Sequence, residues 1–109
     1  MGYHENKQCI EACLECAAIC NHCANSCLKE DNVQKMTECI RMDLECAAIC
    51  KATAEMLIYD TSRAGEICNL CAQICDKCAD ECAQHETEHC KECAEACRRC
   101  AEECRKMAA

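Results

Sequence analysis

The 109-residue sequence contains no proline, phenylalanine or tryptophan, and its two glycines are Gly2 and Gly65. Without proline or glycine inside its long segments, little in the chain interrupts helix formation. No run approaches the ~20 apolar residues needed to span a bilayer. The first residues have neither the charged nor the apolar stretch of an export signal. These absences predict an all-helical cytoplasmic protein without a membrane segment.

Large aliphatic side chains are also scarce. Ile, Leu and Val together number 13, whereas Cys numbers 19 and Ala 17. A core built for packing alone would use Leu, Ile and Val, so cysteine, a small hydrophobe when neutral, has to supply much of the interior. The net charge of −8 disfavours nucleic acid and anionic membrane surfaces as partners.

The cysteines recur at alternating intervals of three and four residues. In the stretch CIEACLECAAICNHCANSC, from Cys9 to Cys27, the intervals are 4, 3, 4, 3 and 4. This is the spacing of the inward seam of a packed helix, and it places successive Cβ atoms roughly 5 to 6 Å apart in one column. Four such columns contain all the cysteines: Cys9, Cys13, Cys16, Cys20, Cys23 and Cys27; Cys39, Cys46 and Cys50; Cys68, Cys71, Cys75, Cys78 and Cys82; Cys90, Cys93, Cys97, Cys100 and Cys104.

Polar connections separate the four columns. The sequence predicts one domain, 1–109, with helices over 5–29, 33–58, 63–84 and 87–107. Asp31, three residues before Gln34, suggests a capping box for the second helix, and Thr61 or Ser62 is a candidate cap for the third. Because the connections are short, the expected fold is all-α, an antiparallel up-down-up-down four-helix bundle with a cysteine-lined core.

Four sulfur columns that converge on one axis predict a metal-binding interior. Thiolates select soft metals such as Cu(I), zinc or iron–sulfur clusters. Zinc needs four sulfurs in a closed tetrahedron, and an iron–sulfur site gathers a few cysteines around one compact cluster. A continuous tube instead suits Cu(I), which accepts two or three bridging thiolates. One Cu(I) per thiolate is also neutral, whereas a divalent ion with four thiolates leaves about two buried negative charges.

Candidate non-cysteine ligands lie near the column ends. His85 continues the third column and is expected at the mouth of the bundle as a Cu(I) ligand, with His89 and Met36 as further candidates there. Asp43 is a carboxylate within a column. It either hydrogen-bonds the thiols, accepts their protons or contacts the metal, or it is a paired structural group. His22 is expected on the surface.

Two soft side chains lie toward the other end of the expected bundle. Met107 extends the fourth column, where methionine usually fills a core, and His4 is expected in a loose terminus. Neither is a principal ligand candidate.

The chain resembles the bacterial copper storage proteins of the cytosolic type over nearly its full length. The motifs that carry the resemblance are CNHC at 20–23, CIRMDLECAAIC at 39–50, CNLCAQICDKC at 68–78 and CKECAEACRRCAEEC at 90–104. The resemblance implies a four-helix bundle in which these 19 cysteines, helped by His or Met near the mouth, hold multiple Cu(I) ions per chain. It also implies a homotetramer, for which the sequence offers four outward-facing apolar residues: Leu14, Ala18, Leu44 and Ala48.

The predicted function is reversible storage of Cu(I) by a protein that is not an enzyme, with a copper chaperone or a small-molecule thiol as the copper donor. The alternatives are a metallothionein-like buffer for zinc or cadmium and an iron–sulfur electron carrier. The odd cysteine count and the expected compartment disfavour a disulfide scaffold. A thioredoxin-like oxidoreductase would need one Cys-x-x-Cys beside a βαβ unit.

Overall fold

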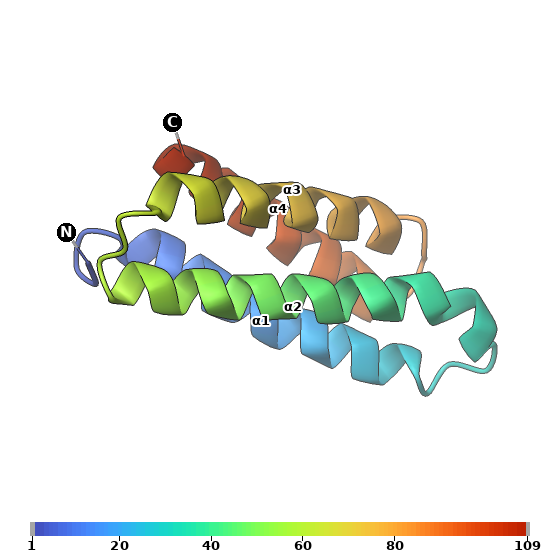
Figure 1. The fold of residues 1–109 in the computed structure, drawn as a ribbon. Helices are drawn as coiled ribbons and strands as arrows, with labels where there is room; N and C mark the ends of the chain where they lie inside the picture. The colour runs from blue at the N-terminus through green and yellow to red at the C-terminus, as the bar shows by residue number, and fades with distance from the viewer. Residues whose placement is uncertain (1, 109) are drawn as a thin grey trace.

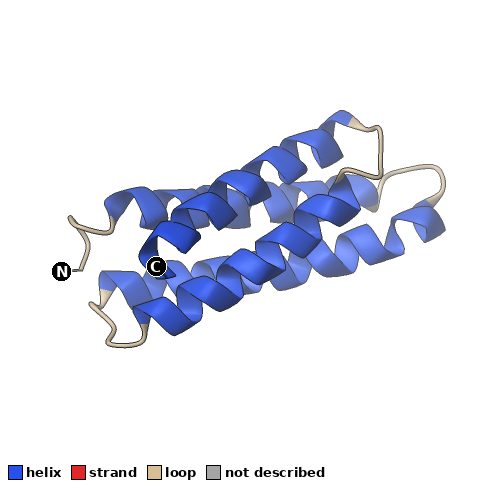
Figure 2. Cartoon of the chain, turned by 90° about the horizontal axis from the view of Figure 1, so that it is seen from above, coloured by secondary structure: helices blue, strands red, loops and turns tan. Residues whose placement is uncertain are grey.

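Four antiparallel α-helices form an elongated bundle in the computed structural model, which describes residues 2–108 (Figure 1). The described residues contain no strand (Figure 2), and the bundle measures 46 × 19 × 17 Å. Each helix packs against two neighbours, α1 and α3 each against both α2 and α4. The predicted four-helix bundle is therefore confirmed. Its elements are α1 Lys7–Cys27, the 3₁₀ turn η1 Val33–Met36, α2 Thr37–Ile58, α3 Ala64–Cys82 and α4 Glu88–Ala108.

The helix ends differ most from the prediction before α2. Residues 33–36 form a 3₁₀ turn, and the predicted capping box at Asp31 is wrong, because the turn is preceded by Asn32 and has no side-chain cap. A 3₁₀ turn is wound more tightly than an α-helix, and here it follows a short connection and leaves Met36 buried. The predicted cap of α3 at Thr61 or Ser62 is also wrong, because Arg63 takes the N-cap position and α3 has no side-chain cap. Thr61 Oγ1 instead accepts a hydrogen bond from Arg63 N at 3.0 Å, within the turn before the helix.

A left-handed residue ends α2. Asp60 has φ 59°, and its N–H donates to Leu57 O, while Thr61 N–H donates to Met56 O. This pair of bonds is the Schellman arrangement, which satisfies carbonyls that the helix end leaves without a partner. The amino-terminal turn lies beside it, since a Cβ at Gly2 would be 3.7 Å from Asp60 Cβ.

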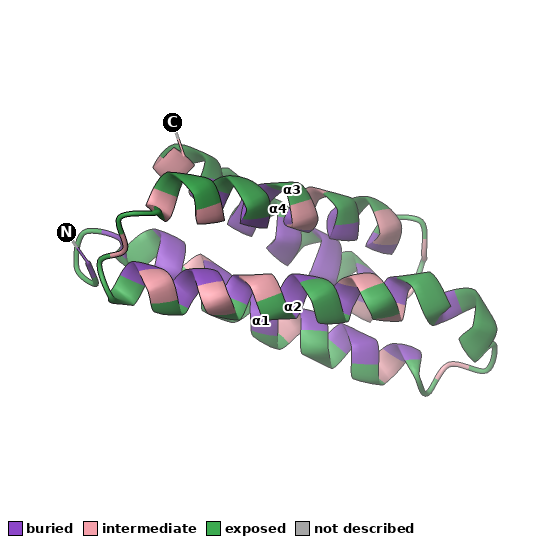
Figure 3. Cartoon of the chain, in the orientation of Figure 1, coloured by how far each residue is buried: buried purple, intermediate pink, exposed green. Residues whose placement is uncertain are grey.

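Buried faces of all four helices point toward the common axis (Figure 3). The sequence LECAAIC occurs at 14–20 in α1 and at 44–50 in α2, and both copies have the same burial pattern, with cysteines inside and the leucine exposed. Both termini lie at the end of the bundle that carries the α2–α3 connection (Figure 1). Within residues 2–108, no helix combines the length and apolarity needed to cross a membrane.

Candidate metal centre

Cysteine side chains fill the axis of the bundle. All 19 are buried free thiols, and they lie within the described residues. The three-four spacing that turns one face of each helix inward therefore places every sulfur column in the core. In α2 and η1, the column positions without cysteine are also buried, and they hold Met36, Asp43, Thr53 and Leu57.

Neighbouring sulfur atoms are close both along a helix and between helices. Along α2, Cys46 Sγ and Cys50 Sγ are 4.0 Å apart. Between helices, Cys46 Sγ lies 3.6 Å from Cys75 Sγ, and Cys50 Sγ lies 3.8 Å from Cys100 Sγ. Cys100 Sγ in turn lies 3.6 Å from Cys13 Sγ. An ion in this core would therefore be within reach of sulfurs from several helices.

Sulfurs at these separations form overlapping groups of four. The members of each group lie within 4.8 Å of one another, which would also suit a zinc tetrahedron. Cys16, Cys20, Cys46 and Cys97 each belong to two groups, however, so separate closed sites cannot fill all groups together. Five groups are Cys13, Cys71, Cys100 and Cys104; Cys16, Cys46, Cys50 and Cys75; Cys16, Cys20, Cys46 and Cys97; Cys20, Cys78, Cys93 and Cys97; and Cys23, Cys27, Cys39 and Cys90.

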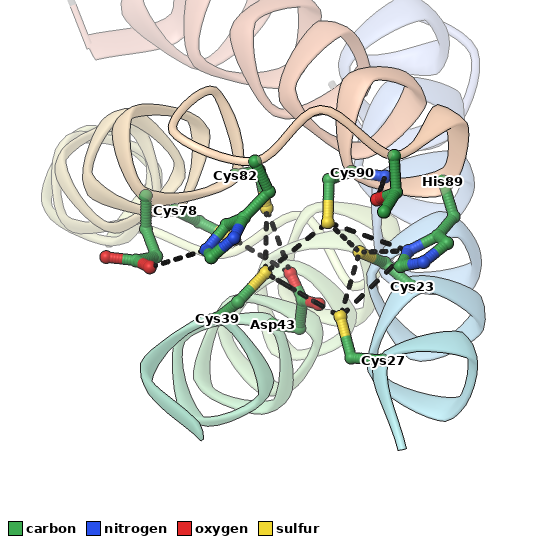
Figure 4. Close-up of polar contacts among 11 residues, drawn as sticks. Cys23, Cys27, Cys39, Asp43, Cys78, Cys82, His89 and Cys90 are labelled. Carbon is green, nitrogen blue, oxygen red and sulfur yellow. Dashed lines mark hydrogen bonds and ion pairs between the residues drawn. The ribbon is translucent and has the colours of Figure 1, made fainter. Parts of the chain in front are cut away.

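His89 covers the last of these groups (Figure 4). Its Nδ1 lies 3.4 Å from Cys23 Sγ, 3.6 Å from Cys90 Sγ and 3.9 Å from Cys27 Sγ. On the other side of the ring, Nε2 lies 3.0 Å from a Glu30 carboxylate oxygen. In the tautomer that carries its proton on Nε2, the ring donates to Glu30 and the Nδ1 lone pair faces the sulfurs. The ring is thus oriented as a metal ligand would be.

A solvent-facing hollow of about 530 Å³ lies beside His89. Its lining also includes His22, Ser26, Glu88 and Glu92. His22 is exposed, as the spacing predicts. The two glutamates make this hollow acidic, so it favours the approach of cations.

His85 and Met36 occupy different surroundings from His89. His85 Nε2 bonds a Glu81 carboxylate oxygen at 3.0 Å, and the ring lines a separate solvent-facing hollow with Ala83 and Lys91. Met36 is buried in the core cluster with the cysteines. Of the two histidines expected near this mouth, His89 is therefore the one that the structure brings into contact with sulfur.

Asp43 lies fully buried among thiols (Figure 4). Its Oδ1 accepts hydrogen bonds from Cys78, Cys82 and Cys93 at 3.3, 3.4 and 3.2 Å, and Cys39 Sγ lies 3.9 Å from Oδ2. Burial, followed by repulsion from the negative charge that Cys93 and Cys78 carry when ionised, raises the pKa of Asp43 to about 10. The carboxyl group is therefore protonated at neutral pH, and the empty core avoids one buried charge.

Burial also acts on the thiols at the His89 end. It is the largest influence on Cys27 and Cys90, and it raises the pKa of both. Before metal arrives, these two sulfurs are consequently protonated at neutral pH.

Sequence reasoning missed the contact of Glu30 with His89, because the two residues are 59 positions apart and no local pattern links them. The bond between Glu81 and His85 has a spacing of four, which pairs side chains on a continuous helix, although α3 ends at Cys82 and His85 lies in the connection after it. That spacing was a signal that His85 has a carboxylate partner of its own.

The chain has close relatives among known proteins. The model of the copper storage protein family, Csp, matches residues 3–109. A curated relative, the uncharacterized cysteine-rich protein YhjQ of Bacillus subtilis (strain 168), is 47% identical over 67 residues, which are 62% of this chain and 62% of that protein. The chain thus spans less than two thirds of that relative.

Solved structures match more of the chain. Cu(I)-bound copper storage protein BsCsp3 is 48% identical with a TM-score of 0.91, over 94% of this chain and 97% of that one. Apo-Csp3 from Bacillus subtilis is 47% identical with a TM-score of 0.87, over 94% and 98%. A cytosolic copper storage protein from Streptomyces lividans, with five coppers, is 43% identical with a TM-score of 0.91, over 94% and 91%. The chain, with its sulfur-lined bundle, belongs to the copper storage protein family.

Proposed function

We propose that this chain stores Cu(I) reversibly on its 19 cysteines, with His89 as the histidine ligand at one end. The observation that carries the proposal is the sharing of sulfurs between neighbouring groups of four. A metal that accepts bridging thiolates can use every sulfur of such an array. Closed four-sulfur sites would instead compete for the sulfurs that belong to two groups. Storage is binding and ligand exchange, without chemical turnover.

Charge supports copper over zinc in this core. Each Cu(I) that replaces one thiol proton leaves the interior neutral. A zinc ion with four thiolates adds about two negative charges to a dry core, and repeating this along the bundle is costly. The iron–sulfur alternative has no support in the family match.

Anaerobic titration of the reduced chain tests the proposal. We expect saturation at about one Cu(I) per cysteine, with release of about one proton per ion. The readouts are ultraviolet thiolate-to-copper absorption and proton release measured with a pH indicator. A parallel zinc titration is the control, and saturation near one zinc per four cysteines, with zinc retained against excess Cu(I), would show a zinc buffer instead.

We propose that His89 receives Cu(I) from solvent at the acidic hollow. Replacing His89 with alanine should slow uptake of the first equivalents on the order of tenfold, because two of the remaining ligands there, Cys27 and Cys90, must first lose protons. Stopped-flow absorbance after mixing with Cu(I) measures this rate. His85→Ala is the matched control and should load at the wild-type rate, since His85 bonds Glu81. Equal slowing of both variants would refute the assignment.

We also propose a cytosolic homotetramer, assembled through the outer face of α1 and α2. Leu14 and Leu44 on this face are 47% and 53% exposed, and Ala18 and Ala48 are exposed beside them. Burying such apolar area stabilises association by about 25 cal/mol per Å². Leu44→Glu should lower the sedimentation mass of the assembly without loss of helicity. A variant that sediments as the wild type would place the interface elsewhere.

A further inference from the structure

The end of the bundle opposite His89 presents a second cluster of soft ligands. Cys9 is 3% exposed, whereas each of the other 18 cysteines is 0% exposed. Cys9 also lines a solvent-facing hollow of about 440 Å³ with Met107 and His4. Among the cysteines, Cys9 at the terminal end of the bundle is therefore the one with residual exposed surface, whereas Cys23, Cys27 and Cys90 beside His89 have none.

Cys9 is joined to the interior. Cys9 Sγ lies 3.8 Å from Cys104 Sγ, and Cys104 Sγ lies 3.9 Å from Cys13 Sγ. Met107, one helical turn after Cys104, packs against the core cluster and lines the hollow, so its thioether is a further soft donor. Cys9 and Cys104 thus link the hollow to Cys13, the next sulfur of the first column, and Met107 lies beside the hollow.

The charge around this hollow differs from that at the His89 end. Two lysines, Lys7 and Lys106, line it together with two glutamates, Glu5 and Glu103, so the charges balance. The hollow beside His89 has glutamates and no lysine among its lining residues. An anionic ligand would consequently meet less repulsion at Cys9 than at His89.

We propose that Cys9, Cys104 and Met107 form a second site of Cu(I) exchange, at which an anionic low-molecular-weight thiol withdraws stored copper. The incoming thiol forms a bond to Cu(I), the Cys9–copper bond breaks, and the proton of the thiol passes to the Cys9 sulfur. Copper remains Cu(I) throughout, so no oxidant or reductant is needed. This inference rests on the proposed storage function for its cargo.

Thiol labelling of the apo protein tests the access route without copper. A limiting amount of iodoacetamide is added anaerobically, and the labelled cysteine is identified by peptide mass spectrometry. We expect Cys9 to carry most of the first label. First labelling of Cys23, Cys27 or Cys90 would overturn the proposal, and so would label spread evenly over all columns, because it would indicate access through unfolding.

Copper removal tests the exchange step. In Lys7→Gln/Lys106→Gln, we expect the loaded protein to transfer Cu(I) to an anionic chelator, bathocuproine disulfonate, about two- to fivefold more slowly at low salt, with an unchanged rate for neutral 2-mercaptoethanol. Lys29→Gln/Lys91→Gln is the matched control and should behave as the wild type. Equal rates in the two double variants would contradict the proposal.

The two experiments separate this inference from the storage function. A chain that loads fully but is first labelled at the His89 end retains the storage function and loses the second site. A chain that fails to load about one Cu(I) per cysteine loses the storage function, while the labelling result still reports which end of the bundle is open.

Discussion

Replacing Asp43 with asparagine should stabilise the apo protein at neutral pH by on the order of 4 kcal/mol. The buried carboxyl group has a pKa of about 10 in the folded chain, against roughly 3.9 in an unfolded chain. Unfolding at pH 7 therefore releases a proton from Asp43, and this release favours the unfolded state. Asparagine has no such proton, and it keeps an oxygen where Oδ1 accepts bonds from three thiols.

The same difference in pKa sets the direction of the pH dependence. The contribution of Asp43 to stability is fully present below pH ~4 and is lost as pH rises toward 10, by about 1.4 kcal/mol per pH unit. Urea unfolding of the reduced apo protein from pH 5 to 7.5 should show a shallower decline for Asp43→Asn than for the wild type. Asp31→Asn, at an exposed carboxylate, is the control. A wild-type slope in Asp43→Asn would show that Asp43 is ionised in the fold.

Loading with Cu(I) should raise the thermal midpoint by about 20 °C or more. Each ion that binds only the folded chain stabilises it by about 4 kcal/mol at a free concentration of 1,000 Kd, and many ions bind. The apo protein gains little stability from the burial of large aliphatic side chains, since Ile, Leu and Val total 13. Circular dichroism during heating of apo and loaded protein measures the shift.

Removal of the metal provides the control for this measurement. An excess of a Cu(I) chelator should return the midpoint to the apo value, and renewed loading should restore the higher one. The expectation requires that ions join sulfurs from different helices, as the contacts of Cys46 with Cys75 and of Cys50 with Cys100 allow. A loaded protein with an unchanged midpoint or with less helix would show that copper binds a loosened chain.

The sequence did not predict which of the two histidines, His85 or His89, contacts the sulfurs. Extrapolating the third column to His85 assumed that the helix continues, but α3 ends at Cys82 and His85 lies in the connection after it. His89 is the second residue of α4 and precedes Cys90, outside the ideal column. At a helix end the side chains have more room, and the ring turns toward the sulfurs of α1 while Glu30 holds its other nitrogen.

The cysteine spacing by itself determined the helical class, the four inward columns and the preference for soft metals, because periodicity along a helix and thiolate chemistry are local properties. Tertiary packing decided which columns share sulfurs, that Asp43 meets thiols from α3 and α4, and that Cys9 keeps exposed surface. These features depend on the axial register between helices. That register is set by how whole side-chain surfaces fit together, which no local spacing specifies.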